Sequence, residues 1–249
     1  MNSLFEYTEV VEECKGSLEG DGDNKLFSEA ERVLSTEINN EEKILKHPIL
    51  HEAFDRIVEQ HVPNQSTAFL SLCTATRPYN KSKKWKGFIN KFGGKVDMIV
   101  VSNGGMMPQQ FWKSWPYLNY DGGDHYDIQM YKDIMHTRLL KFFRKHNYSN
   151  VIANFRPNLI NHQPAHDALA ILKEEGSIGD YIVMPNQELY DKAQSLGWKP
   201  PHGQGDMFPD LTDTILSALI AQVEEFGYDD DLLTIHEKIK YTSQHISVV

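Results

Sequence analysis

The sequence predicts an α/β fold with three layers, in which a short, four-stranded parallel sheet is flanked by helices. Four apolar runs of strand length recur along the chain, and amphipathic helical patterns separate them. A strand, a helix and a further strand in succession indicate parallel strands joined by right-handed crossovers. The expected strands are Thr67–Thr74, Val96–Ser102, Asn150–Phe155 and Asp180–Met184.

Helical patterns precede, separate and follow these strands. A first helix is expected between Glu41 and His61, with Pro48 marking a break or a restart. A last helix is expected after Asp210, which is a suitable N-cap. The helices between the strands are expected at Lys83–Phe92, Ile128–Lys145 and Asn161–Glu175.

The length and composition suit one large domain with an appendage. Residues 1–42 are acidic, and their Gly-Asp-Gly-Asp run predicts a loop or a poorly ordered arm. We therefore expect an N-terminal arm of residues 1–42 and a single catalytic α/β domain of residues 43–249 that includes C-terminal helices. No apolar run approaches the roughly 18 residues that a membrane span needs, and the N-terminus lacks a signal pattern. With only Cys14 and Cys73, both expected as reduced thiols, we expect a cytoplasmic protein without a membrane partner.

The charge is unevenly distributed along the chain. The net charge of −10 opposes binding to a phosphate backbone, yet residues 62–96 contain no Asp or Glu and carry seven Lys and Arg residues among aromatic ones. Such a stretch fits contact with an anionic strand, and it fits a lysine-rich solvated helix equally well. The first interpretation assigns contacts with a nucleic-acid backbone to Lys81, Lys83, Lys84 and Lys86.

Each predicted strand runs into a loop with polar side chains. Ligands of open parallel sheets bind beyond the carboxyl ends of the strands, so these loops predict a binding site. Arg77, held extended before Pro78, is placed to clamp an anionic group, or it is a surface residue of a strand-terminating turn. Asn103 and Asn154 carry amides that can read a base edge, although both positions also suit a turn cap.

A glycine-rich segment after the second strand combines carboxylates with a histidine. Cleavage of a glycosidic bond needs a carboxylate that stabilises positive charge on the sugar or activates water, and His125 can assist proton transfer. We expect Asp124 or Asp127 to supply that carboxylate, while Asp127 also suits the N-cap of the following helix. Pairs of histidines with ligand spacing lack a third clustered ligand, so neither a metal nor another cofactor is expected.

From Cys73 the chain reads Cys-Thr-Ala-Thr-Arg-Pro-Tyr-Asn-Lys-Ser-Lys-Lys-Trp. This segment resembles a motif of archaeosine synthase, a tRNA-modifying enzyme family, which reads Pro-Cys, three residues, Lys-Pro-Tyr, two residues, Ser, two residues, His. The matching residues are Cys73, Pro78, Tyr79 and Ser82, and the replaced ones are Leu72, Arg77 and Trp85. Weaker likeness at residues 100–108 and 125–128 extends the resemblance over about residues 65–200.

The matched domain is similar in outline to the uracil-DNA glycosylase superfamily, which has a compact four-stranded parallel sheet between helices. In that superfamily the first strand ends in an Asp-Pro-Tyr type loop and the second ends in an Asn that reads the base. The resemblance thus implies that the substrate is bound by Arg77, Tyr79, Ser82 and Asn103, to which we add Asn154. Because position 77 lacks a carboxylate, catalysis is left to Asp127, Asp124 and His125.

Three functions compete. The first is a DNA N-glycosylase that flips out and excises a modified base, as a defence enzyme against hypermodified viral DNA would. The second is a transferase like archaeosine synthase, which attaches an amino acid or amine to a modified base in tRNA or DNA. The third is a non-catalytic binder of modified nucleic acid. Because no appended tRNA-binding domain is recognisable, we favour the glycosylase, and DNA over RNA as the partner.

Overall fold

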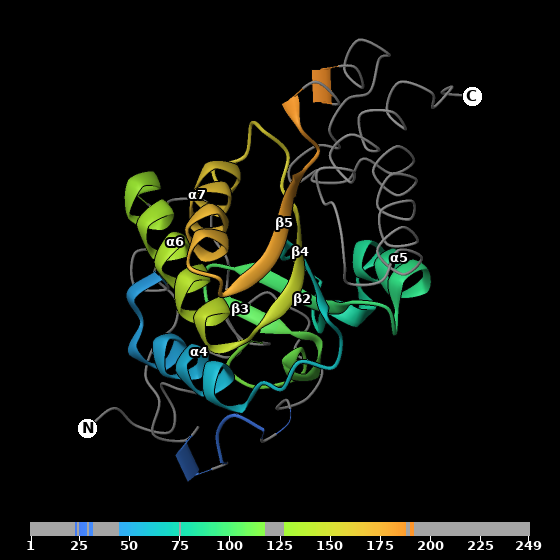
Figure 1. Cartoon of the computed structure of the whole chain (residues 1–249). Helices are drawn as coiled ribbons and strands as arrows, with labels where there is room; N and C mark the ends of the chain where they lie inside the picture. The colour runs from blue at the N-terminus through green and yellow to red at the C-terminus, as the bar shows by residue number, and fades with distance from the viewer. Residues whose placement is uncertain are drawn as a thin grey trace.

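The computed structural model describes residues 23, 25–28, 30–31, 45–74, 76–117, 127–187 and 190–191 (Figure 1). Its helices and strands alternate along the chain as the sequence predicts, except that the strand Gly105–Pro108 directly follows another strand. In chain order they are α4 (Pro48–Gln60), β1 (Thr67–Leu72), η1 (Tyr79–Lys81), α5 (Lys83–Phe92), β2 (Asp97–Ser102), β3 (Gly105–Pro108), η2 (Gln109–Phe111), α6 (Ile128–Lys145), β4 (Tyr148–Asn154), α7 (His162–Glu174) and β5 (Ile178–Met184).

The described strands form one mixed sheet in the order β3-β2-β1-β4-β5. The four predicted strands are present and parallel, but the prediction of a purely parallel, four-stranded sheet is wrong because β3 pairs antiparallel with β2. Ser102 pairs with Gly105, so only Asn103 and Gly104 connect these two strands. An Asn-Gly pair favours such a short hairpin connection. The segment expected as a ligand-binding loop is therefore largely an edge strand.

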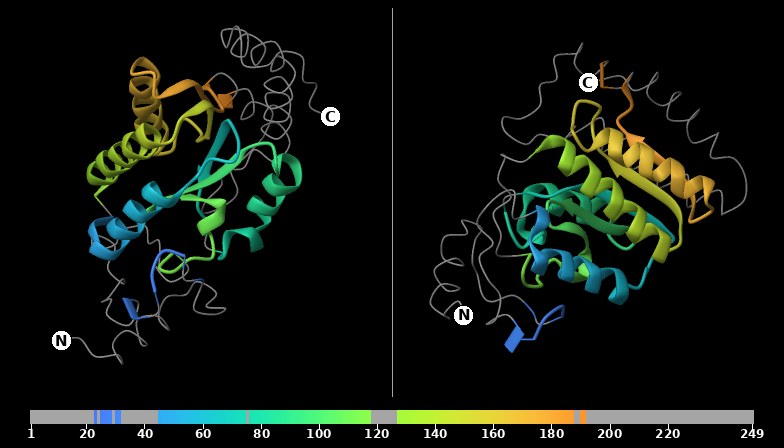
Figure 2. Two further views of the ribbon diagram at one scale, coloured as in Figure 1. Left: turned by 60° about the horizontal axis from the view of Figure 1, so that its bottom comes forward. Right: turned by 90° about the vertical axis from the view of Figure 1, so that its left-hand side faces the viewer.

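Helices flank both faces of the sheet (Figure 2). One face carries α4, α6 and α7, and the other carries α5. The strand β1 shows why both faces are covered: its residues are buried on both sides, with Phe69 packing edge-on against Phe88 of α5 at a centroid distance of 4.8 Å. Strands buried on both faces read as continuous apolar runs, which is the pattern that identified them in the sequence.

The helix boundaries follow their capping residues. The predicted bounds of α5 and α6 are confirmed: Ser82 Oγ accepts the Trp85 N–H at the start of α5, and Asp127 accepts the Met130 N–H at the start of α6. The break or restart expected at Pro48 is confirmed, because Leu45 and Lys46 are helical, His47 is not, and α4 begins at Pro48. The last helix, expected after Asp210, lies outside the described residues.

Part of the predicted acidic arm packs on the domain. Leu26 and Phe27 are buried, and the Phe27 ring meets Trp115 edge-on at 5.3 Å. Arg56 of α4 donates a hydrogen bond to the Leu26 carbonyl at 2.6 Å and lies over the Phe27 ring. These few residues of the arm are therefore part of the hydrophobic core.

Candidate active site

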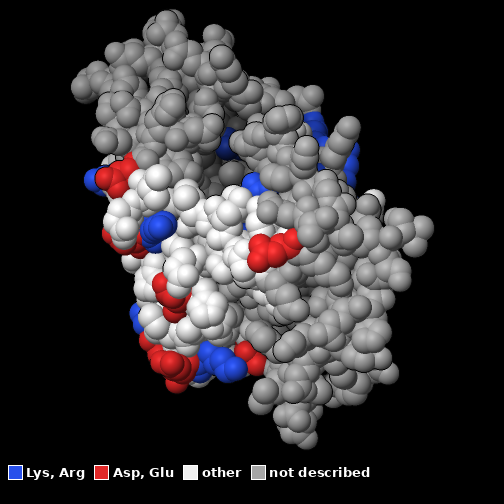
Figure 3. All heavy atoms as spheres, turned by 90° about the horizontal axis from the view of Figure 1, so that it is seen from above, with Lys and Arg blue, Asp and Glu red and all other residues white. Residues whose placement is uncertain are grey.

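The sheet has a topological switch point between β1 and β4. From β1 the chain crosses to β2 through α5 on one face, whereas from β4 it crosses to β5 through α7 on the other face. The loops after these two neighbouring strands thus leave in opposite directions and open a crevice, which is where ligands bind in open α/β sheets. Figure 3 looks down on this edge and shows Lys and Arg atoms within a hollow near its centre.

Asn154 ends β4 beside this crevice. It pairs with Ser71 of β1, and its Nδ2 donates to Ser71 Oγ at 3.3 Å. The side chain is 1% exposed, and its Oδ1 has no hydrogen-bond partner among the residues that the structure describes. An unpaired buried acceptor costs free energy, about 1–3 kcal/mol, until a donor reaches it. Asn154 therefore offers a ready acceptor to a ligand.

Three buried or half-buried cations surround the end of β1, and we call Arg77, Lys84 and Arg156 the basic cluster. Arg77 and Lys84 are only 4% and 6% exposed. Lys84 Nζ donates to the Leu72 carbonyl at 2.9 Å, and both side chains act electrostatically on the Cys73 thiol. Arg156 follows β4 and acts on Lys84 from the other side of the crevice. Its Nε and Nη1 are buried and lack a hydrogen-bond partner within the described part of the chain.

Burial sets the electrostatics of the basic cluster. It lowers the pKa of Lys84 to about 7, with Cys73 opposing the effect and Arg156 adding to it. Burial also lowers the pKa of Arg156 and raises that of Cys73, although Arg77 and Lys84 partly offset the latter. The site therefore combines a concentration of positive charge with an amine that is easily deprotonated. Such a site can bind an anion or stabilise negative charge that develops on a reacting group.

The predicted substrate-binding residues lie in different surroundings. Tyr79 is fully buried, with the Arg77 guanidinium 6.0 Å from its ring centre and Trp112 packed edge-on against it. Ser82 is the N-cap of α5. Tyr79 and Ser82 thus hold the loop and helix that carry the basic cluster. The backbone carbonyl of Asn103 accepts a hydrogen bond from Arg138 Nη1 at 2.6 Å, on the face of the sheet that α6 covers.

Of the predicted catalytic residues, the structure describes only Asp127. Asp127 is exposed and serves as the N-cap of α6, which is the second of the two roles that the sequence suggests for it. Asp124 and His125 lie outside the described residues. Of the predicted backbone-contacting lysines, Lys81 and Lys86 are exposed, and the side chain of Lys83 is not described. Lys84 is buried, so it belongs to the crevice and not to the solvated surface of α5.

Arg156 is a site residue that the sequence analysis did not select. A signal existed: Arg77-Pro78 follows β1 and Arg156-Pro157 follows the neighbouring strand β4. Two Arg-Pro pairs at the ends of adjacent parallel strands predict two guanidinium groups at one crevice. Tyr190, which lies close enough to influence the pKa of Arg156, had no comparable signal.

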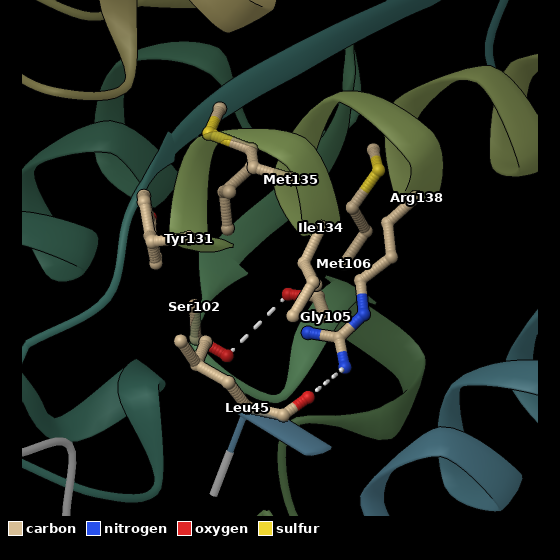
Figure 4. A pocket seen from close by; sticks show the side chains of 9 residues that line it. Leu45, Ser102, Gly105, Met106, Tyr131, Ile134, Met135 and Arg138 are labelled. Carbon is tan, nitrogen blue, oxygen red and sulfur yellow. Dashed lines mark hydrogen bonds between the residues drawn. The ribbon is translucent and has the colours of Figure 1, made fainter. Parts of the chain in front are cut away.

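A second, small cavity lies under α6, between that helix and the β2–β3 hairpin (Figure 4). Its wall is mostly apolar, and Arg138 closes it by donating to the carbonyls of Leu45 and Asn103. The lining residues are Leu45, Val101, Ser102, Gly105, Met106, Tyr131, Ile134, Met135 and Arg138. Its small size and mostly apolar wall make it a packing defect of the core, not a second active site.

The described residues contain no group of three or more His, Cys, Asp or Glu side chains placed to hold a metal ion. Within the same residues, no helix is both long and apolar enough to cross a lipid bilayer.

Comparison with known proteins identifies a family without an assigned activity. No curated protein matches the chain. A solved structure described as AF0587, a protein of unknown function, is similar over 60% of this chain at 16% identity, with a TM-score of 0.39. The chain spans about half the length of that protein, since the match covers 51% of it. The model of a domain of unknown function, DUF5591, matches residues 51–175, just over half of the chain and including the basic cluster. The chain therefore belongs to the DUF5591 family.

Proposed function

We propose that this protein is an enzyme that excises a modified nucleobase flipped out of DNA by cleaving its N-glycosidic bond. The observation that carries the proposal is the buried basic cluster, which stands with Asn154 at the switch point between β1 and β4. The likeness of its first-strand loop to the archaeosine synthase motif, and of its outline to the uracil-DNA glycosylase superfamily, directs the proposal to nucleobases. A hypermodified base of viral DNA fits such a defensive enzyme.

The basic cluster suits the chemistry of this reaction. When the glycosidic bond breaks, the base leaves with the bonding electron pair and acquires negative charge. Cations fixed in a site of low dielectric stabilise that charge without reorganising. Asn154 offers an amide to the edge of the base, and its unpaired Oδ1 gains a partner when a base N–H reaches it.

Exposed lysines beside the crevice suit the nucleic-acid strand. Lys81 and Lys86 lie in η1 and α5, on either side of the buried Lys84 along the chain. Lysines on the surface attract phosphates, whereas the cations of the crevice act on the flipped nucleotide. This division explains how a chain with a net charge of −10 can bind DNA through one local region.

The test is to incubate the protein with hypermodified phage DNA and with unmodified DNA, and to measure release of free base by mass spectrometry. Alkali-labile abasic sites in the modified DNA are the expected result. Arg156→Met should lower the rate about 100-fold or more, by analogy with loss of one oxyanion donor. The matched control is Arg144→Met, because Arg144 is exposed and paired with Glu175 on the surface. No base release from any DNA would refute the proposal.

A second candidate is a transferase that attaches an amino acid or amine to a modified base. The observation that favours it is the Cys73 thiol, which both resembles the motif cysteine of archaeosine synthase and lies beside Arg77 and Lys84. The same incubation distinguishes the two activities when amino acids and modified tRNA are included. A mass gain on the base without abasic sites would show transfer, and binding without either change would show a non-catalytic reader.

A further inference from the structure

Lys84 occupies a position that an ordinary structural lysine would avoid. It is the second residue of α5, where the helix dipole disfavours a cation. Its side chain is only 6% exposed, whereas Lys86, the other α5 lysine whose surroundings are described, is exposed to solvent. Arg156 also disfavours protonation of Lys84. Its amine is buried and held at the end of β1 by a hydrogen bond to the Leu72 carbonyl, and a residue that departs in this way from local preferences is a candidate for a functional position.

We propose that Lys84 is the nucleophile of the reaction, attacking C1′ of the flipped nucleotide and forming a covalent imine with its sugar. This inference rests on the proposed function. It adds a substrate class, nucleotides that are attacked at C1′ of the sugar, and a covalent intermediate of the kind that lyases form. The motif that relates this chain to archaeosine synthase does not include position 84. The assignment comes from the burial and surroundings of the side chain.

The surroundings of Lys84 keep its amine reactive. Burial and the nearby Arg156, opposed by Cys73, lower its pKa to about 7, so a substantial share of the amine is neutral near neutral pH. An unperturbed lysine, with a pKa of about 10.4, is neutral in roughly one molecule in 2,500 at about pH 7. Desolvation beside another cation is an established way to activate a lysine as a nucleophile. The hydrogen bond to the Leu72 carbonyl holds Nζ at the end of β1.

The position of Lys84 fits an approach to the sugar. Leu72 adjoins Ser71, which pairs with Asn154 on the neighbouring strand, and neighbouring strands lie about 4.8 Å apart. A nucleotide whose base is held at Asn154 therefore lies close to the end of β1, where Nζ is bound. Arg156, two residues after Asn154, is near enough to Lys84 to lower its pKa.

The step balances without an added oxidant or reductant. The lone pair of Nζ forms a bond to C1′ while the bond from C1′ to the base nitrogen breaks, and the base leaves with that electron pair. A proton lost from Nζ neutralises the base. The sugar ring then opens: the bond from C1′ to the ring oxygen breaks, the oxygen takes a proton from water, and a protonated imine joins Lys84 to C1′. Water hydrolyses that imine and frees the enzyme.

Borohydride reduction tests the inference, because it converts the imine to a stable amine. The whole protein is incubated with the DNA from which it releases base, and separately with DNA carrying a preformed abasic site, each with sodium borohydride. We expect a protein–DNA adduct that survives denaturing electrophoresis, and peptide mass mapping should place it on Lys84. Lys84→Arg and Lys84→Met should lose the adduct, whereas Lys145→Met, at an exposed lysine paired with Glu59, should keep it.

The outcomes separate the two proposals. Base release by the wild-type protein without an adduct on Lys84 would overturn the nucleophile and leave the glycosylase standing. Without base release from any DNA the glycosylase fails, and the abasic DNA still decides whether Lys84 forms an imine. Mapping on the wild-type protein keeps the test valid even where a Lys84 variant does not fold. An adduct that maps to another lysine would also refute the role of Lys84.

Discussion

A buried histidine at the opposite edge of the sheet makes the fold sensitive to acid. His61 Nε2 lies 2.7 Å from the Tyr148 hydroxyl, which in turn donates to Asp97 at 3.1 Å. His146 meets the His61 ring edge-on at 4.8 Å. Burial, and secondly His146, lower the pKa of His61 to about 4, while a hydrogen bond with Gln110 opposes them. This network joins the end of α4 to the starts of β2 and β4, so protonating it loosens the packing of α4 on the sheet.

The expected magnitude follows from the pKa difference. His61 has a pKa of about 4 in the folded protein and 6.5 as the reference value of the unfolded chain. Above pH 6.5 both states are neutral and stability is complete. As the pH falls from 6.5 to 4 the unfolded chain takes up a proton that the folded protein excludes, so stability is lost. At about 1.4 kcal/mol per unit, His61 costs about 2 kcal/mol between pH 7 and pH 5, and about 3 kcal/mol below pH 4.

The measurement is urea unfolding at pH 7 and pH 5 for the wild-type protein and His61→Gln, which removes the titration but keeps an N–H donor for Tyr148. Other histidines contribute to the pH dependence of both proteins, so only the difference between them is compared. The free energy of unfolding of the wild type should fall by about 2 kcal/mol more than that of the variant. His166→Gln, at an exposed position, should behave like the wild type. Equal losses in the wild type and His61→Gln would refute the reasoning.

Three further predictions concern stability and the remaining carboxylate. Gly105 has a φ of 130°, and a Cβ there would lie 2.8 Å from the Phe54 ring. Gly105→Ala should therefore lower the free energy of unfolding by about 1–3 kcal/mol. The control Gly87→Ala, with open space around it, should not destabilise the protein. Arg138→Met removes hydrogen bonds to the carbonyls of Leu45 and Asn103 and should lower the free energy of unfolding, measured by thermal unfolding, by about 2–3 kcal/mol. A loss below about 0.5 kcal/mol, which is about the smallest net value of a single hydrogen bond, would contradict this. Asp127→Ala should cost about 1 kcal/mol of helix capping, and Asp127→Asn very little. If Asp127 is also catalytic, Asp127→Asn will abolish base release despite normal stability; unchanged release would leave it as a cap alone.

The regular elements were predictable because their signals are local. The period of apolar residues located α5 and α6 to the residue, and uninterrupted apolar runs located the four parallel strands. The strand β3 was missed because four residues after an Asn-Gly pair satisfy two interpretations, a ligand loop and a hairpin. Only the pairing partner, β2, decides between them.

The candidate site was predictable in its place but not in its members. The rule for open parallel sheets directs attention to the carboxyl ends of the strands, and Arg77 and Asn154 lie at that edge. Charge alone predicts a surface lysine at position 84. Its spacing of four residues from Phe88, which packs on Phe69, places it on the buried side of α5. Tyr79 was predicted to bind the substrate but is buried in the core. An aromatic ring near a strand end suits a pocket wall and a core equally well, so the sequence does not distinguish the two.

The hairpin strand β3 also decides how the sheet meets other molecules. Without it, β2 would present a row of unsatisfied amides along a long apolar edge, a template on which foreign strands can grow. β3 covers that row with four residues and ends in Pro108, which has no N–H to offer to a further strand. Substitutions that weaken the pairing of β3 with β2 should therefore cause the protein to aggregate before they affect any chemistry at the basic cluster.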